Sequence, residues 1–207
     1  MSRIINIRGT SGAGKTHIVR NIMARYPIRE PHLIAGRKQP IGYTFRRETG
    51  NALFVAGHYE GACGGCDNLS QGLDYIYELI YEATARSEDV IFEGLIVASD
   101  WRRCVELRRN NQLLIIGLNT SLADCCKSVD ERRAERALIR GKEAAPLRMD
   151  PDGVQKNTRA KYNALLSQQK YFAIQGLDFR VLDRQAALQA CIAFLDLVSV
   201  PIHQMPV

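Results

Sequence analysis

A glycine-rich segment near the amino terminus has the composition and spacing of a phosphate-binding loop. It matches the pattern G-x-x-x-x-G-K-[ST] in full and reads Gly9, Thr10, Ser11, Gly12, Ala13, Gly14, Lys15, Thr16. Glycines let such a loop turn tightly, so that backbone N–H groups and the start of the following helix face phosphate oxygens. Lys15 would reach the β- and γ-phosphates, and the Thr16 hydroxyl would ligate Mg²⁺. We therefore expect the chain to bind a nucleoside triphosphate.

Two acidic residues are candidates to complete this site. Glu93 follows the apolar residues 90–92 and would therefore lie at the end of a buried strand, beside the metal ion. It could equally be an ordinary solvated acid at a strand end. Asp67, in a loop before the next predicted helix, could accept the proton of an acceptor hydroxyl or could cap that helix. The residues leave the catalytic base open between Asp67 and Glu93.

A third group of candidates is a cluster of arginines in the second half of the chain. Arg132 and Arg136 are four residues apart on one face of a predicted helix, and Arg133 lies beside them. Guanidinium groups can stabilise the negative charge that spreads over a phosphoryl group during transfer. We expect a catalytic lid over approximately residues 121–152. The alternative is a solvent-exposed helix stabilised by i,i+4 ion pairs.

An acceptor could be held by a predicted hairpin between residues 41 and 59. The candidate substrate-binding residues are polar or aromatic and are Thr44, Arg46, His58 and Tyr59. Arg46 could hold a phosphate, and Tyr43, Phe45 and Tyr59 could stack on a nucleobase. Cross-strand aromatic packing with exposed arginines explains the same pattern equally well.

The elements that must position these residues alternate between strands and helices. Apolar runs predict strands at residues 3–7, 89–94, 112–118 and 178–182, in addition to the hairpin. Helical periodicity predicts helices at residues 17–25, 69–86, 100–110, from 121 onward, 154–175 and 185–198. The alternation predicts an α/β fold, a three-layer α/β/α sandwich with a mostly parallel five-stranded sheet and a ligand crevice at the strands' carboxyl ends. We expect one domain over residues 1–200 and a frayed tail over 201–207.

The overall charge points to a polyanionic partner. The chain of 207 residues has a net charge of +6, and residues 101–161 contain 14 lysines and arginines against eight acids. Such a charge favours a polyanionic partner over a small anion, although basic soluble enzymes are common. The six cysteines do not form the pattern of a secreted disulfide framework, and no leader or membrane-spanning apolar run is evident. These features predict a cytoplasmic protein without a membrane partner.

The candidate motifs resemble those of a known class of enzymes. Residues 9–16, the segment 92–94 and the cluster at 132–136 together resemble P-loop nucleoside and nucleotide kinases over nearly the whole chain. Residues 57–61 (Gly-His-Tyr-Glu-Gly) and 66–70 (Cys-Asp-Asn-Leu-Ser) are similar to the bacteriophage 5-hydroxymethyluracil DNA kinases. Membership would imply ATP as donor, Mg²⁺, and phosphorylation of the base's hydroxymethyl group in DNA.

The resemblance also implies a biological setting and leaves two alternatives. The 5-phosphomethyluracil product would be a step in thymine hypermodification, by which phage DNA evades restriction in the host cytoplasm. One alternative is a kinase of small-molecule nucleosides or nucleotides. The other is a nucleotide-dependent DNA-binding switch that transfers no phosphoryl group.

Overall fold

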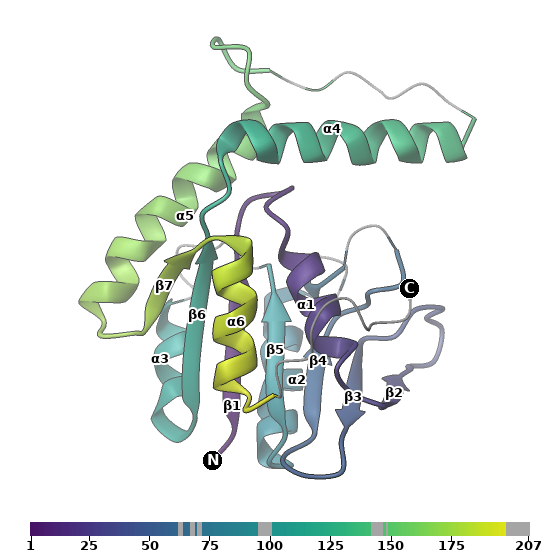
Figure 1. Ribbon diagram of the computed structural model, residues 1–207, viewed down its shortest axis with the longest axis vertical. Helices are drawn as coiled ribbons and strands as arrows, with labels where there is room; N and C mark the ends of the chain where they lie inside the picture. The colour runs from purple at the N-terminus through teal and green to yellow at the C-terminus, as the bar shows by residue number, and fades with distance from the viewer. Residues whose placement is uncertain are drawn as a thin grey trace.

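The computed structural model describes residues 1–61, 64–66, 69, 72–94, 101–141, 147 and 149–197. Its strands are β1 (Arg3–Arg8), β2 (Ile28–His32), β3 (Gly42–Arg46), β4 (Leu53–Ala56), β5 (Asp89–Glu93), β6 (Gln112–Leu118) and β7 (Phe179–Leu182). Its helices are α1 (Lys15–Met23), α2 (Gly72–Ala85), α3 (Trp101–Asn110), α4 (Leu122–Ile139), α5 (Lys156–Ile174) and α6 (Arg184–Phe194). Figure 1 shows α4 lying across the ends to which the β5 and β6 arrowheads point.

All seven strands form one sheet in the order β2-β3-β4-β5-β1-β6-β7. The five strands from β4 to β7 in this order are parallel, whereas β3 is antiparallel to β4 and β2 is antiparallel to β3. The α/β prediction is confirmed, but the predicted five-stranded sheet is too small. The unassigned stretch of residues 27–40 contains β2, an exposed edge strand whose residues do not alternate between apolar and polar.

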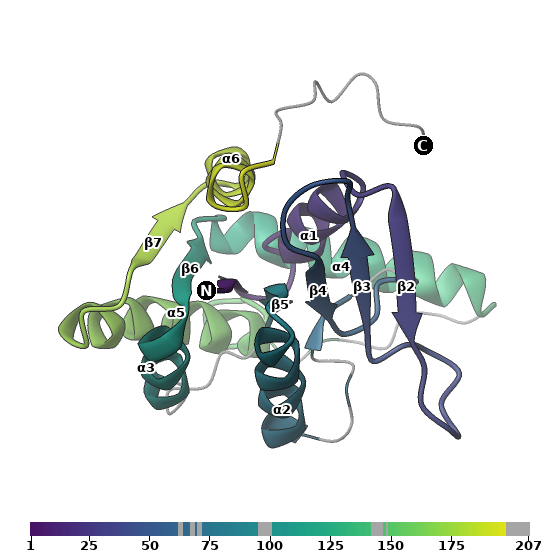
Figure 2. The ribbon, with the colours of Figure 1, turned by 90° about the horizontal axis from the view of Figure 1, so that it is seen from below.

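Helices cover both faces of the sheet (Figure 2). The side chains of β1 alternate between the two faces, as a strand requires: Ile5 and Ile7 belong to the core beneath α1 and α6, and Ile4 belongs to the core with α2, α3 and α5. All three isoleucines are fully buried. Both faces of β1 are therefore buried, as in a parallel sheet covered by two helical layers, although the face of Ile4 also carries the buried polar side chains of Asn6 and Arg8.

The helix boundaries differ from the predicted ones by a few residues. α2 begins at Gly72 instead of residue 69, and α6 ends at Phe194 instead of residue 198. Two helix starts are fixed by side chains: Ser121 accepts a hydrogen bond from the Asp124 N–H at 3.1 Å, and Asp183 accepts one from the Ala186 N–H at 2.8 Å. The predicted tail, residues 201–207, lies outside the described residues. In the part of the chain that is described, no helix has the length and apolar character needed to cross a bilayer.

A buried ion pair joins the first residues of β1 and β5. The Asp89 carboxylate is completely buried and accepts from the Arg3 backbone N–H at 2.9 Å and from the Arg3 guanidinium at 2.7 and 3.0 Å. Asn51, just before β4, donates to the same carboxylate at 3.1 Å. Asp89 therefore connects three neighbouring strands at the edge of the sheet where the parallel strands begin.

We predict that Asp89→Ala lowers the free energy of unfolding by about 3 kcal/mol, because it removes the buried carboxylate of the pair and leaves the Arg3 guanidinium with only the exposed Asp196 carboxylate. Chemical denaturation measures this change. Asp178→Ala, which removes an exposed pair with Arg180, is the matched control and should cost about 1 kcal/mol or less. Equal losses in the two variants would contradict the assigned role of Asp89.

Candidate phosphate-binding site

The glycine-rich loop connects β1 to α1 and is packed closely against α4. Gly12 has φ +85°, and Gly14 has φ +98° at the residue that caps α1. A Cβ atom on Gly12 would overlap the backbone carbonyl oxygen of Cys125 in α4. Position 12 therefore requires glycine both for its left-handed backbone and for the approach of the helix.

The back of the loop is held by residues that no motif indicated. The Ala13 carbonyl accepts from the Thr120 hydroxyl and from the Arg184 Nε, each at 2.9 Å, and the Thr10 hydroxyl donates to the Thr158 carbonyl at 3.0 Å. Thr120 precedes α4, Thr158 lies in α5 and Arg184 begins α6. Three helices distant in sequence thus fix the loop conformation, which sequence spacing alone could not reveal.

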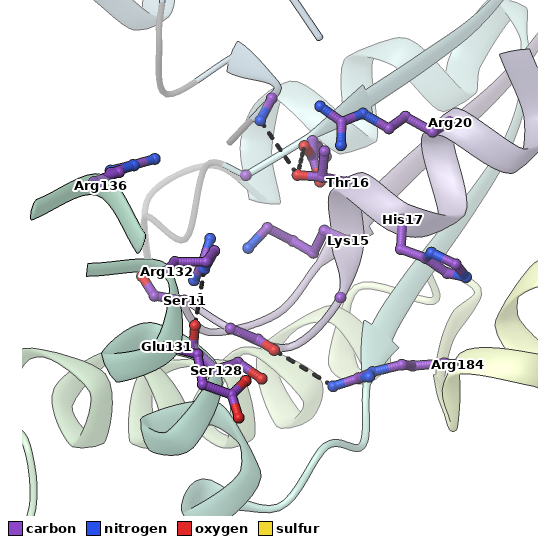
Figure 3. Close-up of a pocket in the computed structure, with 15 residues that line it drawn as sticks. Ser11, Lys15, Thr16, His17, Arg20, Ser128, Glu131, Arg132, Arg136 and Arg184 are labelled. Atoms are coloured by element: carbon purple, nitrogen blue, oxygen red, sulfur yellow. Dashed lines mark hydrogen bonds between the residues drawn. The ribbon is translucent and has the colours of Figure 1, made fainter. Parts of the chain in front are cut away.

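A pocket of about 570 Å³ opens in front of the loop (Figure 3). Its polar lining comes from the loop, α1, the end of β5, α4 and the start of α6, and comprises Ser11, Gly12, Gly14, Lys15, Thr16, His17, Arg20, Gly64, Glu93, Gly94, Ser128, Glu131, Arg132, Arg136 and Arg184. The Lys15 ammonium group donates to the carbonyls of Gly9 and Thr10 at 2.9 and 3.2 Å. The fold therefore brings the loop, the strand-end acid and the arginines of α4 to one cavity.

Glu93 lies directly beside the loop because β5 is a parallel neighbour of β1, with Ile7 opposite Glu93. Its Oε1 accepts a hydrogen bond from the Thr16 hydroxyl at 2.8 Å, and its side chain is almost fully buried. Gly65 (φ +94°) passes so close that a Cβ there would overlap Glu93. Glu93 is thus a buried carboxylate that is hydrogen-bonded to Thr16. The alternative that Glu93 is an ordinary solvated acid at a strand end is therefore wrong.

The donor set formed by Thr16 and Glu93 fits Mg²⁺. This ion prefers oxygen ligands, and it is usually held by one or two carboxylates together with substrate phosphates and water. A hydroxyl and a carboxylate oxygen 2.8 Å apart at the phosphate loop supply such ligands. Among the described residues no group of three or more His, Cys, Asp or Glu side chains could hold a metal by itself. That finding agrees with a cation shared between protein and phosphates.

The two lid arginines enter the pocket from α4, one helical turn apart. Arg132 is half-buried and donates from Nε to the Ser128 carbonyl at 3.0 Å, whereas Arg136 is exposed. The same helix also carries an i,i+4 contact between Lys127 and Glu131 at 4.0 Å, on exposed side chains. Helix α4 therefore has both features that the sequence suggested, with its arginines on the pocket side.

Thr44 and Arg46 are not brought to the pocket. Strand β3 is antiparallel, so it runs away from the phosphate loop, and Arg46 lies at the opposite edge of the sheet beside Glu30, 3.2 Å away. Thr44 is buried in mid-strand within 2.8 Å of the His32 Nε2. The alternation along this strand was readable from consecutive residues, whereas its direction depends on the strand with which it pairs.

His58 and Tyr59 follow β4 on the same edge as the phosphate loop, but both are buried and neither lines the pocket. Burial raises the pKa of the Tyr59 phenol well above its ordinary value, and the nearby Glu93 raises that pKa further. Burial lowers the pKa of the His58 imidazole, and the charge of Arg37 adds to the effect. Arg20 of α1 donates to the Tyr59 carbonyl at 2.8 Å and so holds the segment after β4 against α1.

The remaining aromatic candidates, Tyr43 and Phe45, are also in the core, with 0% and 2% exposure. The cross-strand packing alternative therefore describes them better than stacking on a nucleobase. Asp67, the candidate base, lies outside the described residues.

A phosphate-binding loop between a parallel strand and a helix, an acid on the adjacent strand and an arginine-bearing helix across both are the parts of a P-loop phosphotransferase. No protein-family model matches the chain. It is 38% identical over 190 residues to the "5-hmdU DNA kinase" of Pseudomonas phage PaMx11, covering 91% of this chain and 94% of that one. The chain belongs to the 5-hmdU DNA kinase family.

A second relative agrees with this assignment, and one solved structure shares the fold. The "5-hmdU DNA kinase" of Pseudomonas phage M6 is 30% identical over 146 residues, which cover 66% of this chain and 75% of the relative. A chain from the structure of the PezAT chromosomal toxin–antitoxin system of Streptococcus pneumoniae matches with a TM-score of 0.51. That match covers 89% of this chain and 70% of the other at 15% identity, and it shows a shared fold alone.

We predict that Gly12→Ala weakens nucleoside triphosphate binding by about tenfold or more, because the new Cβ moves the loop away from Cys125 and strains a left-handed residue. Isothermal titration calorimetry measures the affinity. Gly176→Ala is the matched control: Gly176 also has a positive φ, +65°, but a Cβ there meets its nearest atom at 3.6 Å, far from the loop. Unchanged affinity in Gly12→Ala would contradict the proposed loop geometry.

Proposed function

We propose that this member of the 5-hmdU DNA kinase family transfers the γ-phosphoryl group of ATP to the hydroxymethyl group of 5-hydroxymethyluracil in DNA. The acceptor oxygen forms a bond to the γ-phosphorus while the bond to the β,γ-bridging oxygen breaks. The products are 5-phosphomethyluracil in DNA, ADP and a proton. One observation carries the proposal: a chain 38% identical to a 5-hmdU DNA kinase has its phosphate loop, Glu93 and lid arginines around one pocket.

The donor side of the reaction is assigned to the phosphate loop. Backbone N–H groups of residues 9–16 bind the β- and γ-phosphates, and the start of α1 adds its favourable dipole. The Lys15 ammonium group, which lies within the pocket, moves from the loop carbonyls to the phosphate oxygens when the donor enters. Thr16 and Glu93 would hold Mg²⁺, which would neutralise part of the negative charge of the donor phosphates.

The arginines of α4 act on the charge that develops during transfer. Arg132 and Arg136 face the pocket from the side opposite α1 and Lys15. Their guanidinium groups donate hydrogen bonds to the equatorial oxygens of the transferring group, where negative charge spreads. Arg136 is the more exposed of the two. We therefore assign its contact with the transferring group to the state in which α4 is closed over bound donor and acceptor.

The two acids are given different roles. The Glu93 carboxylate already accepts a hydrogen bond from Thr16 and lies behind the loop, so we assign it to the metal. A base that takes the acceptor proton must lie beside the acceptor instead. Asp67 is our candidate for that base. In the sequence it directly follows the segment 64–66, in which Gly65 passes close to Glu93.

The DNA acceptor is supported by family membership and by charge. The family relatives are named for action on 5-hmdU in DNA, and this chain carries a net charge of +6. Cations bind the phosphate backbone of nucleic acids with a strong dependence on salt. Transfer of label from γ-labelled ATP into DNA that contains 5-hydroxymethyluracil, but not into thymine DNA, tests the proposal. Transfer to free nucleosides only would overturn it.

We predict that Lys15→Ala lowers kcat for phosphorylation of 5-hmdU DNA by about 100-fold or more, because a preorganised cation is lost from the transition state. Radiolabel transfer under saturating substrates measures kcat, and thermal denaturation shows whether the fold is retained. Lys170→Ala, an exposed lysine on α5, is the matched control and should keep kcat within about twofold. Full activity in Lys15→Ala would exclude the loop as the donor site.

We further predict different responses from the two acids. Glu93→Gln should raise the Mg²⁺ concentration needed for half-maximal activity by about tenfold, because a charged oxygen ligand is lost. Asp67→Asn should leave that concentration unchanged and lower kcat at saturating Mg²⁺ by about 100-fold, as expected for loss of a general base. Magnesium titrations of both variants make the measurement, and the reverse pattern would exchange the two assignments.

A further inference from the structure

The connection between β2 and β3, residues 33–41, leaves the sheet on the same edge as the phosphate loop. His32 at the end of β2 pairs with Gly42, and Gly42 pairs with Ala56 at the end of β4. Strand β4 is parallel to β5, which ends at Glu93. Figure 2 shows this connection extending beyond the body of the sheet. We call residues 33–38 the apical loop.

The apical loop is anchored at its base and exposed at its tip. The Ile41 N–H donates to the His32 carbonyl at 2.9 Å, and the Gly57 N–H donates to the Ile41 carbonyl at 2.8 Å. Ile41 is buried, whereas Leu33 is 63% exposed and Ile34 is 36% exposed. Two consecutive large apolar side chains are thus displayed to solvent on a connection whose ends are hydrogen-bonded to the sheet.

Cations follow this apolar pair directly. Arg37 and Lys38 belong to the apical loop, and residues 33–41 contain no acid. The Arg37 N–H donates to the Ile34 carbonyl at 3.2 Å, so the cations and the apolar tip are joined in one turn. Burial lowers the pKa of His58, in the segment after β4, and the positive charge of Arg37 lowers it further.

This composition is suited to a DNA duplex. Proteins that open base stacks insert apolar side chains between base steps, and cations beside them bind the phosphate backbone. The reaction requires such opening, because the donor pocket is a polar cavity of about 570 Å³ that holds Glu93 almost fully buried. A base stacked within a duplex cannot bring its hydroxymethyl group to such a pocket without leaving the stack.

We propose that Leu33 and Ile34 enter the DNA base stack and occupy the space left by the extruded 5-hydroxymethyluracil, while Arg37 and Lys38 bind the adjacent phosphates. The inference rests on the proposed function, since it takes DNA as the acceptor. It adds that the substrate is duplex DNA and that the apical loop, outside the phosphate pocket, recognises it.

The test compares one acceptor strand in three forms: in a matched duplex, in a duplex with an unpaired bubble at the 5-hydroxymethyluracil, and as a single strand. The double variant Leu33→Ser, Ile34→Ser should lower kcat/KM on the matched duplex by about tenfold or more, since the cost of unstacking is no longer offset. On the bubble and the single strand the loss should stay within about threefold. Fluorescence of 2-aminopurine next to the target should report less base opening in the variant.

A second variant separates apolar insertion from charge. The double variant Arg37→Ala, Lys38→Ala should weaken binding to the matched duplex and to the single strand alike. The slope of log binding affinity against log salt concentration should fall by about one for each cation removed. The matched control is Ile174→Ser at the end of α5. Ile174 is 77% exposed but precedes β7, so it lies toward the opposite edge of the sheet. Its kcat/KM should match that of the unaltered protein on all three substrates.

Several results would overturn the inference. Equal losses of the Leu33→Ser, Ile34→Ser variant on duplex and single strand would exclude insertion, and so would full activity on both. Full activity together with a changed sedimentation coefficient would instead make the apical loop a contact between copies of this chain. The proposed function is tested separately, with the unaltered protein. It fails if that protein phosphorylates free nucleosides but no DNA.

Discussion

The hydrogen bond between the Thr16 hydroxyl and the Glu93 carboxylate joins the two parts of the fold on which the site depends. Thr16 begins the helix after the phosphate loop, and Glu93 ends the neighbouring parallel strand. Pairing of β1 with β5 places them together, and the almost complete burial of Glu93 makes its charge costly unless it is balanced. The Thr16 hydroxyl, which donates a hydrogen bond, and a cation can provide that balance. The buried acid thus links the energetics of the core to binding of the donor.

The loop itself depends on helices that come much later in the chain. The carbonyl of Ala13 is held by Thr120 and Arg184, and Gly12 contacts the first turns of α4. The helix that brings Arg132 to the pocket therefore also supports the glycine-rich loop on its other side. This packing couples the position of α4 to the shape of the loop.

The antiparallel strands form a different part of the sheet. Two antiparallel strands, β3 and β2, extend the parallel core, and their connection returns to the edge where the parallel strands end. The segment after β4 is buried and holds Tyr59 next to Glu93, while the apical loop stays exposed.

Consecutive residues determined much of this protein by themselves. The phosphate loop and its flanking strand and helix are readable from residues 3–25, because the motif is local and its backbone requirements are met by its own glycines. The buried strands were readable from their apolar runs. Only the tertiary structure decided that Arg184 joins the site and that Arg46 does not, because strand order and direction depend on contacts between distant segments. Strand β2 escaped prediction for a related reason: an exposed edge strand has no buried face to impose a pattern on its sequence.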